Sequence, residues 1–379
     1  MSLYFSHFTP KIIFGNDCSN EVGSHVTALG GKKVLLVVDP FMTKGDMLSP
    51  VLDSLRKESI AVEIFSEVEP EPSLRCIRNS VSSARLLDCD FVIGLGGGSA
   101  MDVAKTTAAM LKHEGDIVEY LGANKFTKSG TPTILMPTTA GTGSELGRGA
   151  LFYVEERRTK ESIFSDFMLT NLAMIDPKWT LTCPASVTAS SGMDALSHAM
   201  ESYTNKFATP ISMAVAEKAI ALLTKWLPVA VNDGTNLVGR EQTALGAMFA
   251  SIALANANTH AVHALAYPLQ GANRIPHGVA NSVMMPFVFE AISDSASDRF
   301  ERIAEIMEID TQNDSVSQAL FRLSKEIHLP ETIHALGVEF DQIPSFTTHA
   351  HQNRRLMNNC PKDLSEDQIR TIFMRAMGN

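Results

Sequence analysis

The stretch DFVIGLGGGSAMDVAK, residues 90–105, carries an apolar run, three consecutive glycines and a helix-forming segment in that order. A strand that ends in a glycine turn and continues as a helix is the local unit of a parallel α/β sheet. Glycines let a phosphate approach the backbone, and the exposed N–H groups at a helix N-terminus attract an anion. The spacing is not the Gly-x-Gly-x-x-Gly fingerprint, and an ordinary turn explains three glycines equally well. The stretch therefore predicts the fold class and offers a candidate phosphate site.

Short β-branched runs and helix-like stretches alternate on both sides of this segment. We expect further strands at residues 33–39, 61–65 and 132–136, and helices at residues 47–57 and 80–87. Strand, helix and strand in this rhythm indicate parallel pairing with right-handed crossovers. The N-terminal part is therefore predicted to be an α/β domain with a parallel sheet.

The second half of the chain has a different character, because long helical stretches follow residue 186 with almost no strand signal. The clearest are residues 210–227, 240–257 and 297–307. A chain of 379 residues also exceeds the length at which one core usually keeps growing. We expect an α/β domain at residues 1–183 and an all-α domain at residues 184–379.

Charge and cysteine usage narrow the classes of partner. The formal net charge is 32 − 42 = −10 and no Lys/Arg run exceeds two residues, so a nucleic-acid partner is not expected. No stretch approaches the roughly 18 consecutive apolar residues that a membrane helix needs. The five cysteines are scattered, without the spacing of a zinc knuckle or a disulfide framework. These features predict a cytoplasmic protein with free thiols.

A second turn and one strand-end aspartate strengthen the case for a dinucleotide. Residues 137–145, PTTAGTGSE, also follow a predicted strand and supply several small hydrogen-bond donors. Asp39 ends an earlier strand, at the sheet edge where open α/β folds bind ligands. Its carboxylate can accept both ribose hydroxyls and would repel a 2′-phosphate, which favours NAD over NADP. The alternative is an aspartate that caps the next helix.

Histidines and one aspartate suggest a metal site in the second half. Asp194 and His198 lie four residues apart on a predicted helix and therefore on one face, although a surface ion pair has the same spacing. His260, His263 and His277 follow among small apolar residues. One carboxylate and several imidazoles suit Fe(II), Zn or a similar divalent ion. The spacing leaves the choice between His260 and His263 open.

These motifs together closely resemble the iron-containing (group III) alcohol dehydrogenase family, from about Phe14 to the C-terminus. The resemblance rests on GGGSxxD, TTxGTGSE and GMDAxxHAxE in this order, where x is any residue. It implies a dinucleotide-binding α/β domain joined to a helical metal-carrying domain, and leaves His260 as a structural neighbour of the site. The implied metal ligands are Asp194, His198, His263 and His277.

The same resemblance implies a set of cofactor-binding positions. These are Gly97, Gly98 and Ser99 at the pyrophosphate, Asp39 at the adenosine ribose, and Asp102, Thr138, Thr139, Thr142, Ser144 and Lys160 around the dinucleotide.

The chain departs from the family pattern in three places. Glu71 replaces the asparagine of a Pro-Asn-Pro turn near the cofactor, and Leu146-Gly147 replaces Val-Thr, with Arg148 next along the chain. Arg148 is either close to a negative group of the substrate or simply solvated. Tyr267 stands where many relatives carry histidine, four residues after His263 and just before a proline where we expect the helix to kink or end. We expect Tyr267 either to be catalytic, by bonding the substrate oxygen or passing a proton, or to pack as a core tyrosine.

The resemblance implies an NAD-dependent alcohol dehydrogenase that interconverts small alcohols and aldehydes or ketones by hydride transfer, using one divalent metal ion. Fe(II) is the first expectation, with Zn or another divalent ion as alternatives, and we expect a homodimer or higher homo-oligomer. The alternative is a dehydroquinate-synthase-like lyase that also uses NAD and one metal. Such a lyase needs several basic residues around its substrate, whereas residues 181–205 carry no Lys or Arg and residues 256–285 only one, Arg274.

Overall fold

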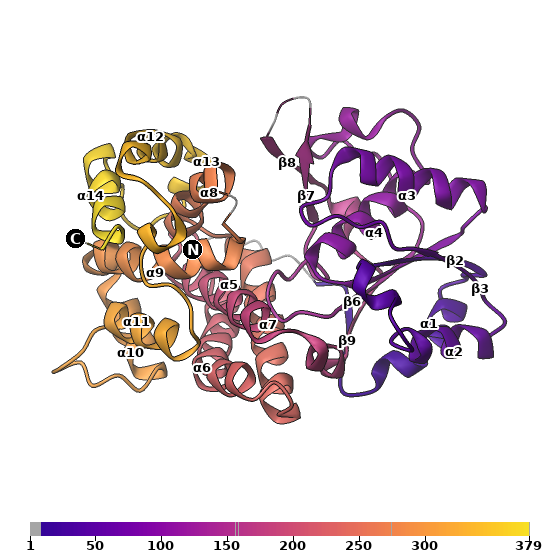
Figure 1. The fold of residues 1–379 in the computed structure, drawn as a ribbon, viewed down its shortest axis with the longest axis horizontal. Helices are drawn as coiled ribbons and strands as arrows, with labels where there is room; N and C mark the ends of the chain where they lie inside the picture. Colours follow the sequence, from indigo (N-terminus) through magenta and orange to yellow (C-terminus); the bar gives the residue numbers. More distant parts are fainter. Residues whose placement is uncertain (1–8, 156, 158, 274, 379) are drawn as a thin grey trace. The chain divides into compact units, whose positions relative to one another are not determined.

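The computed structural model describes residues 9–155, 157, 159–273 and 275–378. These residues form two compact units (Figure 1). One unit contains residues 9–139 and Gly143–Thr180, and the other contains Ala140–Thr142 and residues 181–378. The first is built around a parallel sheet and the second is helical, which confirms the predicted fold class.

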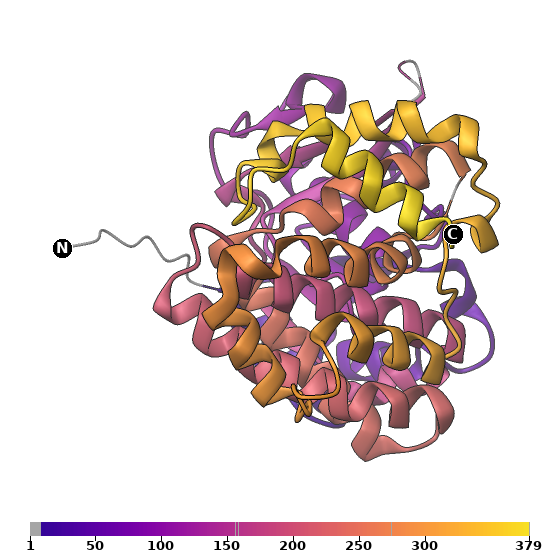
Figure 2. The same ribbon diagram turned by 90° about the vertical axis from the view of Figure 1, so that its left-hand side faces the viewer.

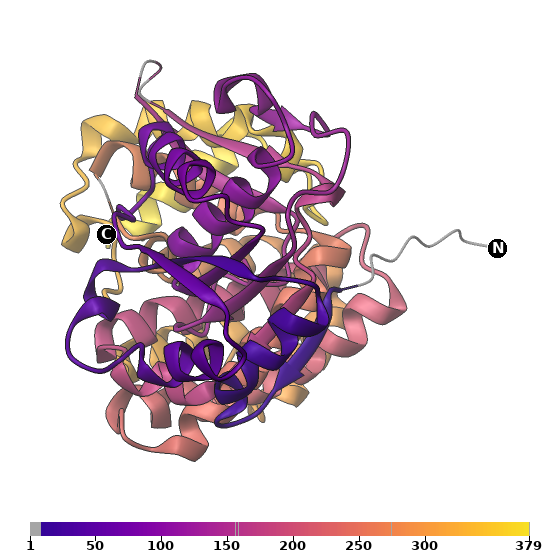
Figure 3. The same cartoon turned by 90° about the vertical axis from the view of Figure 1, so that its right-hand side faces the viewer.

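The α/β unit holds six parallel strands in the order β1-β9-β6-β4-β2-β3 (Figure 3). The strands are β1 (Lys11–Phe14), β2 (Lys33–Val38), β3 (Ala61–Phe65), β4 (Phe91–Gly96), β6 (Thr133–Pro137) and β9 (Leu172–Ile175). The helices of this unit are α1 (Val22–Ala28), α2 (Ser49–Lys57), α3 (Leu74–Leu86) and α4 (Gly98–Met110). Strands β4 and β6 are buried along their whole length, as expected for a parallel sheet covered on both faces.

Alternate residues of β2 belong to two separate cores, because successive side chains of a strand point to opposite faces. Leu35 and Val37 pack in the cluster that includes residues of α3 and α4. Val34 and Leu36 pack in the cluster that includes residues of α1 and α2. The sheet is thereby held between two helical layers, with the carboxyl ends of β2, β4 and β6 at one common edge.

A small second sheet is a feature that the sequence analysis did not predict. It orders β5 (Gly122–Ala123), β8 (Thr159–Phe164) and β7 (Gly149–Val154), and β7 pairs with β8 antiparallel. The expected alternation of strands and helices therefore does not hold after β6. This sheet carries two of the residues of interest, since Lys160 lies on β8 and Arg148 directly precedes β7.

The helical unit surrounds α5, which packs against α6, α7 and α9 (Figures 1 and 2). Its helices are α5 (Ala185–Thr204), α6 (Pro210–Asn232), α7 (Leu237–Ala257), α8 (Ala261–Asn273), α9 (His277–Ile292), α10 (Ser297–Ile306), α11 (Val316–Glu326), α12 (Ile343–Gln352), α13 (Arg354–Met357) and α14 (Glu366–Ala376). Most of α5 is buried, polar residues included. A helix in this position can hold metal ligands in fixed places.

Helix α8 decides between an end of the helix at Pro268 and its continuation past that residue. It contains Pro268 and continues to Asn273, so the helix does not end at the proline. Proline removes one backbone donor, but packing can hold the helix together across it. Among the described residues, none of the helices combines the length and the apolar character that crossing a membrane requires.

Candidate functional site

The four side chains predicted as metal ligands lie together in the helical unit. Asp194 and His198 come from α5, His263 from α8, and His277 is the first residue of α9. One ligand atom from each lies within 4.8 Å of every other, the one cluster of this kind that the described part of the chain contains. Asp194, His198 and His263 are buried, whereas the side chain of His277 is 35% exposed. The cluster is therefore open toward solvent on the side of His277.

All three imidazoles turn their Nε2 atoms toward one carboxylate oxygen. The distances from Asp194 Oδ1 are 3.6 Å to His198, 3.8 Å to His263 and 3.4 Å to His277. Metal–ligand bonds to nitrogen and oxygen are about 2.0–2.2 Å, so ligands at these separations can share one ion between them.

The protonation states also suit a cation. Burial lowers the pKa of His263 to about 4, against the opposing effect of Asp194, and burial likewise lowers the pKa of His198. Burial raises the pKa of Asp194, but the three histidines and an amide hydrogen bond outweigh it and hold the pKa below its ordinary value. Neutral imidazoles and an ionised carboxylate are the forms that bind a metal. The residues present therefore fit one divalent ion, with a donor set suited to Fe(II) or Zn.

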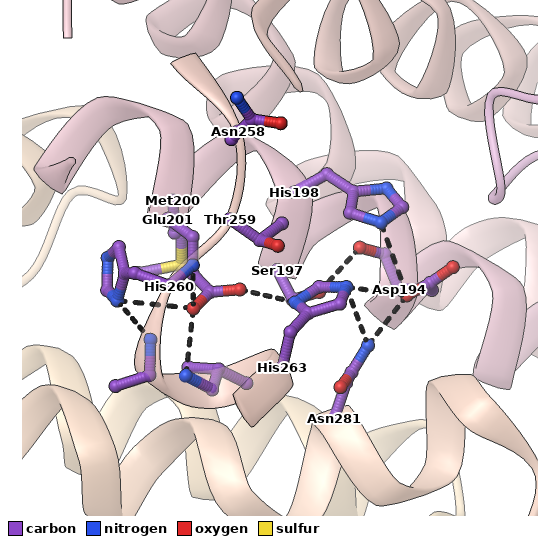
Figure 4. A network of polar contacts seen from close by, with 12 residues as sticks. Asp194, Ser197, His198, Met200, Glu201, Asn258, Thr259, His260, His263 and Asn281 are labelled. Carbon is purple, nitrogen blue, oxygen red and sulfur yellow. Dashed lines mark hydrogen bonds and ion pairs between the residues drawn. The ribbon is translucent and has the colours of Figure 1, made fainter. Parts of the chain in front are cut away.

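Glu201 fixes the orientation of His263. Its buried Oε2 accepts a hydrogen bond from His263 Nδ1, and its Oε1 accepts from the backbone N–H groups of His260 and Val262 at 2.9 and 2.8 Å. With Nδ1 donating, the Nε2 atom of His263 is left unprotonated and faces the cluster. Figure 4 shows the Glu201 carboxylate between His260 and His263, with the Asp194 cluster on the other side of His263. A carboxylate behind a ligating histidine is the usual support of a metal site.

His260 lies outside the cluster. Its Nδ1 accepts the backbone N–H of Ala261 at 2.7 Å, and its Nε2 lies 2.9 Å from the hydroxyl of Thr204. Both ring nitrogens thus have partners within the protein. The structure places His263 in the cluster and His260 beside Glu201.

Asn281 is a further polar residue against the cluster. Its amide nitrogen donates to Asp194 Oδ1 at 2.8 Å and lies 3.2 and 3.3 Å from the Nε2 atoms of His263 and His277. Asn281 is fully buried on α9. It steadies the Asp194 carboxylate from the side opposite to α5.

Tyr267 and Arg355 border the cluster. The Tyr267 ring stacks on His277 with centroids 6.1 Å apart and meets His263 edge-on at 6.5 Å. Burial raises the pKa of Tyr267, while Arg355, charged and hydrogen-bonded to the phenol, opposes the rise. Burial is the main cause of the lowered pKa of His263. Asp194 raises this pKa, and the charge of Arg355 lowers it by a smaller amount.

In the α/β unit, the Asp39 carboxylate binds the glycine turn. Asp39 Oδ2 accepts the backbone N–H of Gly97 at 2.8 Å, and no cap bond joins the Asp39 side chain to the short helix that follows it. The helix-capping alternative is therefore wrong. Burial raises the pKa of Asp39 above its ordinary value, and the hydrogen bond from the Gly97 N–H offsets only part of this rise.

The glycine turn has room for a ligand. Helix α4 begins at Gly98, and a Cβ added at Gly97 would meet no atom closer than 3.7 Å. Gly97, Gly98 and Ser99 are all partly exposed at this helix start. At Gly96, by contrast, a Cβ would lie 2.5 Å from Asp39 Oδ2. The absence of a side chain at Gly96 therefore allows Asp39 to pack closely against the turn.

Two of the predicted cofactor residues bind each other. Ser144 Oγ donates to Asp102 Oδ1 at 2.5 Å, and Asp102 also accepts the backbone N–H of Leu151. The buried Lys105 lies 3.2 Å from Asp102 and donates to the Ser144 carbonyl at 2.9 Å. This network ties α4 to the segment 144–151.

The remaining predicted cofactor residues do not form one cluster. Thr138 is buried and donates its backbone N–H to Gly96, Thr139 is partly exposed, and Thr142 is exposed and grouped with the helical unit. Lys160 forms an ion pair with Glu71.

Two family departures have partners in the α/β unit. Lys160 Nζ lies 2.5 Å from Glu71 Oε1, so Glu71 binds a residue that we predicted to contact the cofactor. Arg148 forms an ion pair with Asp166, and its guanidinium lies 4.7 Å from the centre of the Phe164 ring. Arg148 is thus anchored within its own unit rather than solvated.

Sequence reasoning assigned no role to three residues that surround the metal cluster. Glu201 is three residues after His198 on α5 and Asn281 is four after His277 on α9, so helical periodicity could have found both. Arg355 comes from a distant short helix, and no local pattern links it to the site.

Comparisons with known proteins agree with this arrangement. A sequence model described as "Iron-containing alcohol dehydrogenase" matches residues 9–177, and one described as "Fe-containing alcohol dehydrogenase family, C-terminal" matches residues 188–377. Long-chain-alcohol dehydrogenase 1 of Geobacillus thermodenitrificans (strain NG80-2) is 35% identical, with 97% of this chain and 95% of the relative covered.

Solved structures give the same result. The structure of a 1,3-propanediol oxidoreductase superimposes with a TM-score of 0.94 at 35% identity, covering 99% of this chain and 100% of the other. Sulfoacetaldehyde reductase from Bifidobacterium kashiwanohense, solved in complex with NAD+, gives a TM-score of 0.92 at 27% identity, with 100% and 99% covered.

Proposed function

Because the chain belongs to the iron-containing alcohol dehydrogenase family and is an oxidoreductase acting on CH–OH groups, we propose that it uses NAD(H) and one divalent ion, iron(II) first, on small alcohols and aldehydes or ketones. The observation that carries the proposal is the buried cluster of Asp194, His198, His263 and His277. Residues 1–183 bind the dinucleotide in this proposal, and residues 184–379 bind the metal and the substrate.

Two observations support NAD(H). A relative of the same fold was solved with NAD+, and the α/β unit offers an open glycine turn at the start of α4. The Asp39 carboxylate lies at that turn. A negative charge there disfavours the 2′-phosphate of NADP. In the proposal, Gly97, Gly98, Ser99, Asp102, Thr138, Thr139, Thr142, Ser144 and Lys160 line the dinucleotide.

The donor chemistry supports a divalent ion. An ion bound by one carboxylate and three imidazoles supplies Lewis-acid polarisation of the substrate oxygen, and the nicotinamide exchanges hydride with the carbon. Asp194 contributes the negative charge of the donor set, and the neutral histidines contribute lone pairs. Metal identity follows availability as well as ligand type, and we place iron(II) first on family membership.

The protein's own groups prepare this chemistry. Glu201 holds His263 in one tautomer and orientation, and Asn281 holds the Asp194 carboxylate. Burial of three ligands excludes water from most sides and leaves the partly exposed His277 side for the substrate. Tyr267, stacked on His277, is the group that we propose to hydrogen-bond the substrate oxygen or to pass its proton.

The decisive experiment follows the absorbance of NADH during incubation of the metal-loaded protein with a panel of small aldehydes and ketones. NADH should be consumed in proportion to the alcohol formed, and elemental analysis of protein purified without added metal should find one ion per chain. A protein that contains the metal but leaves NADH unchanged with every carbonyl compound would contradict the proposal. A dehydroquinate-synthase-like lyase would give that result, and the family matches do not favour it.

Assembly and location are further parts of the proposal. We propose a homodimer or higher homo-oligomer, which size-exclusion chromatography with light scattering would test. The five cysteines are all free thiols, which supports a reducing compartment such as the cytoplasm. Fractionation of the producing cells would test the location.

A further inference from the structure

The amide nitrogen of Asn281 lies against one face of the metal cluster. It donates to Asp194 Oδ1 at 2.8 Å and lies 3.2 Å from His263 Nε2 and 3.3 Å from His277 Nε2. Within the described part of the chain, no hydrogen bond joins it to the fourth ligand, His198. The amide nitrogen therefore covers the face of the cluster that is formed by the other three ligand atoms.

The orientation of this amide is set by Asp194. An ionised carboxylate only accepts hydrogen bonds, so the nitrogen of the amide must face it rather than the oxygen. Figure 4 shows the nitrogen of Asn281 turned toward Asp194 and His263, with the oxygen turned away. An amide nitrogen carries two N–H groups and shares its lone pair with the carbonyl, so it cannot serve as a metal ligand. The group on this face is thus one that a cation does not bind.

Packing alone does not explain an amide at this position. Asn281 is fully buried, and its Oδ1 has no hydrogen-bond partner among the described residues. A buried carbonyl without a partner is unfavourable, and an apolar side chain of the same shape would avoid that cost. The next residue, Ser282, is equally buried, but its hydroxyl is paired with that of Ser324. The polar group of Asn281 is therefore explained by its contacts with the cluster.

We propose that Asn281 closes one face of the metal site to water and to further ligands, so that a bound ion keeps its free position on the side of His198 and His277. This inference rests on the proposed function, since it concerns the ion of that same site. A catalytic metal centre needs an open position, and each additional donor reduces the positive charge that the ion offers to the substrate oxygen. Asn281 acts through the coordination of the ion and is therefore a positioning residue.

The exposure of the ligands agrees with this direction of entry. The side chain of His277 is 35% exposed, whereas those of His198 and His263 are 6% and 4% exposed. A substrate can therefore reach the cluster only through a face to which His277 belongs. Asn281 covers one such face, and the faces that His277 shares with His198 remain.

Cobalt(II) is the probe for the test, because its visible absorption weakens as its coordination number rises. The metal-free parent loaded with Co(II) gives the reference spectrum and affinity. Asn281→Ala leaves a space beside a carboxylate and a cation, where a water molecule would have polar partners. The coordination number should then rise and the visible absorption should fall several-fold. Loss of the hydrogen bond to Asp194 should weaken Co(II) binding about 10- to 100-fold.

Two further variants separate the closing of the face from the support of Asp194. Asn281→Leu keeps the branched shape without a donor, so Co(II) should bind more weakly while the spectrum of the loaded protein stays that of the parent. Asn281→Asp places a carboxylate oxygen where the amide nitrogen lies. This variant should bind Co(II) more tightly than the parent and should absorb more weakly. A cooperative melting transition checks that each variant is folded.

Ser282→Ala is the matched control, because Ser282 is buried on the same helix and bonds to Ser324 rather than to the cluster. Its spectrum and its affinity for Co(II) should equal those of the parent. A parent-like spectrum in Asn281→Ala would overturn the inference. Equal spectral changes in Asn281→Ala and Asn281→Leu would also overturn it, because they would trace the effect to Asp194 alone.

The same measurements distinguish this inference from the proposed function. A parent that binds no Co(II) would refute the metal-dependent function and the inference with it. A parent that binds Co(II) and oxidises NADH with an aldehyde, but shares its spectrum with Asn281→Ala, would support the function and refute the closed face.

Discussion

Glu201 and His263 are joined by a buried hydrogen bond between the carboxylate Oε2 and the imidazole Nδ1. The bond links α5 to α8, and the opposite nitrogen of the same ring faces the metal cluster. The orientation of one ligand is therefore set by a residue that is not itself a ligand.

Glu201→Gln should weaken metal binding about 10- to 100-fold, the usual effect of losing a group that supports a ligating histidine. The glutamine amide keeps one oxygen acceptor, but its N–H₂ group must face either the backbone N–H donors of His260 and Val262 or the imidazole of His263. One buried hydrogen bond is lost in either case, so the melting temperature should fall as well. Metal titration of the stripped protein measures the affinity. The control is Glu217→Gln. This carboxylate is partly exposed and binds Tyr203 and Arg302. Parent-like metal affinity in Glu201→Gln would contradict the assigned role.

Single alanine substitutions of the histidines should separate ligands from neighbours. His263→Ala and His277→Ala each remove a nitrogen from the cluster and should lose bound metal and turnover together. His260→Ala should keep its metal, because both ring nitrogens of His260 bond within the protein. Elemental analysis after gel filtration checks this. If only the His260 variant loses its metal, the assignment of His263 is wrong.

The Asp39 carboxylate should set the cofactor preference. The parent should use NAD(H) far better than NADP(H), and Asp39→Gly should narrow the gap by about tenfold or more, since close like charges repel by about 1–4 kcal/mol. Asp39→Asn keeps an acceptor for Gly97 N–H while removing the charge, so it should narrow the gap as well. The measurement is kcat/KM for both cofactors, and a parent that prefers NADP(H) would refute the assignment.

Tyr267→Phe tests the phenol alone. If the hydroxyl takes part in proton transfer or holds the substrate oxygen, kcat should fall by roughly a hundredfold and its pH dependence should change. Metal content and melting temperature should stay near the parent values, because the ring can keep its stacking on His277. An unchanged kcat and pH profile would return Tyr267 to a packing role.

Glu145 should make the stability of the protein depend on pH. Burial raises its pKa to about 7 from 4.5, against the lowering effect of Lys105. Between about pH 4.5 and 7 the folded chain keeps a proton that the unfolded chain releases, so the free energy of unfolding falls as the pH rises through this window and then levels off. Glu145→Gln should remove this slope and add on the order of 1–3 kcal/mol at pH 8.

Chemical denaturation of both proteins at several pH values measures the effect. Glu161→Gln, at a more exposed carboxylate paired with Arg157, is the control and should keep the slope of the parent. A parallel pH dependence in Glu145→Gln and the parent would show that another group is responsible.

The sequence predicted the features that depend on local pattern. Strands β4 and β6 are largely apolar runs that end at Gly96 and Pro137, and β2 is a similar run that ends before Asp39. The structure has β2 and β6 within one residue of the predicted bounds. Strands β1 and β9 were missed because runs of three or four apolar residues fit a strand or a helix equally well. Strand β8 was missed because Lys160 and Glu161 interrupt its apolar pattern.

The ligands of the metal cluster could not be predicted from the local sequence pattern alone. Helical spacing brought Asp194 and His198 together, but only the family resemblance selected His263 over His260. Their different roles depend on the ring nitrogen Nε2, which faces Asp194 in His263 and Thr204 in His260, a tertiary arrangement that spacing does not encode.

Helix α5 carries Asp194, His198 and Glu201 and is also the helix around which α6, α7 and α9 pack. Any ion bound to these side chains is bound by the folding core itself. Metal supply and the lifetime of the protein are then linked by mass action, since a ligand that binds only the folded chain protects it from unfolding. A cell short of the metal would lose the enzyme to proteolysis as well as its turnover, so the abundance of the protein would report the metal status of its surroundings.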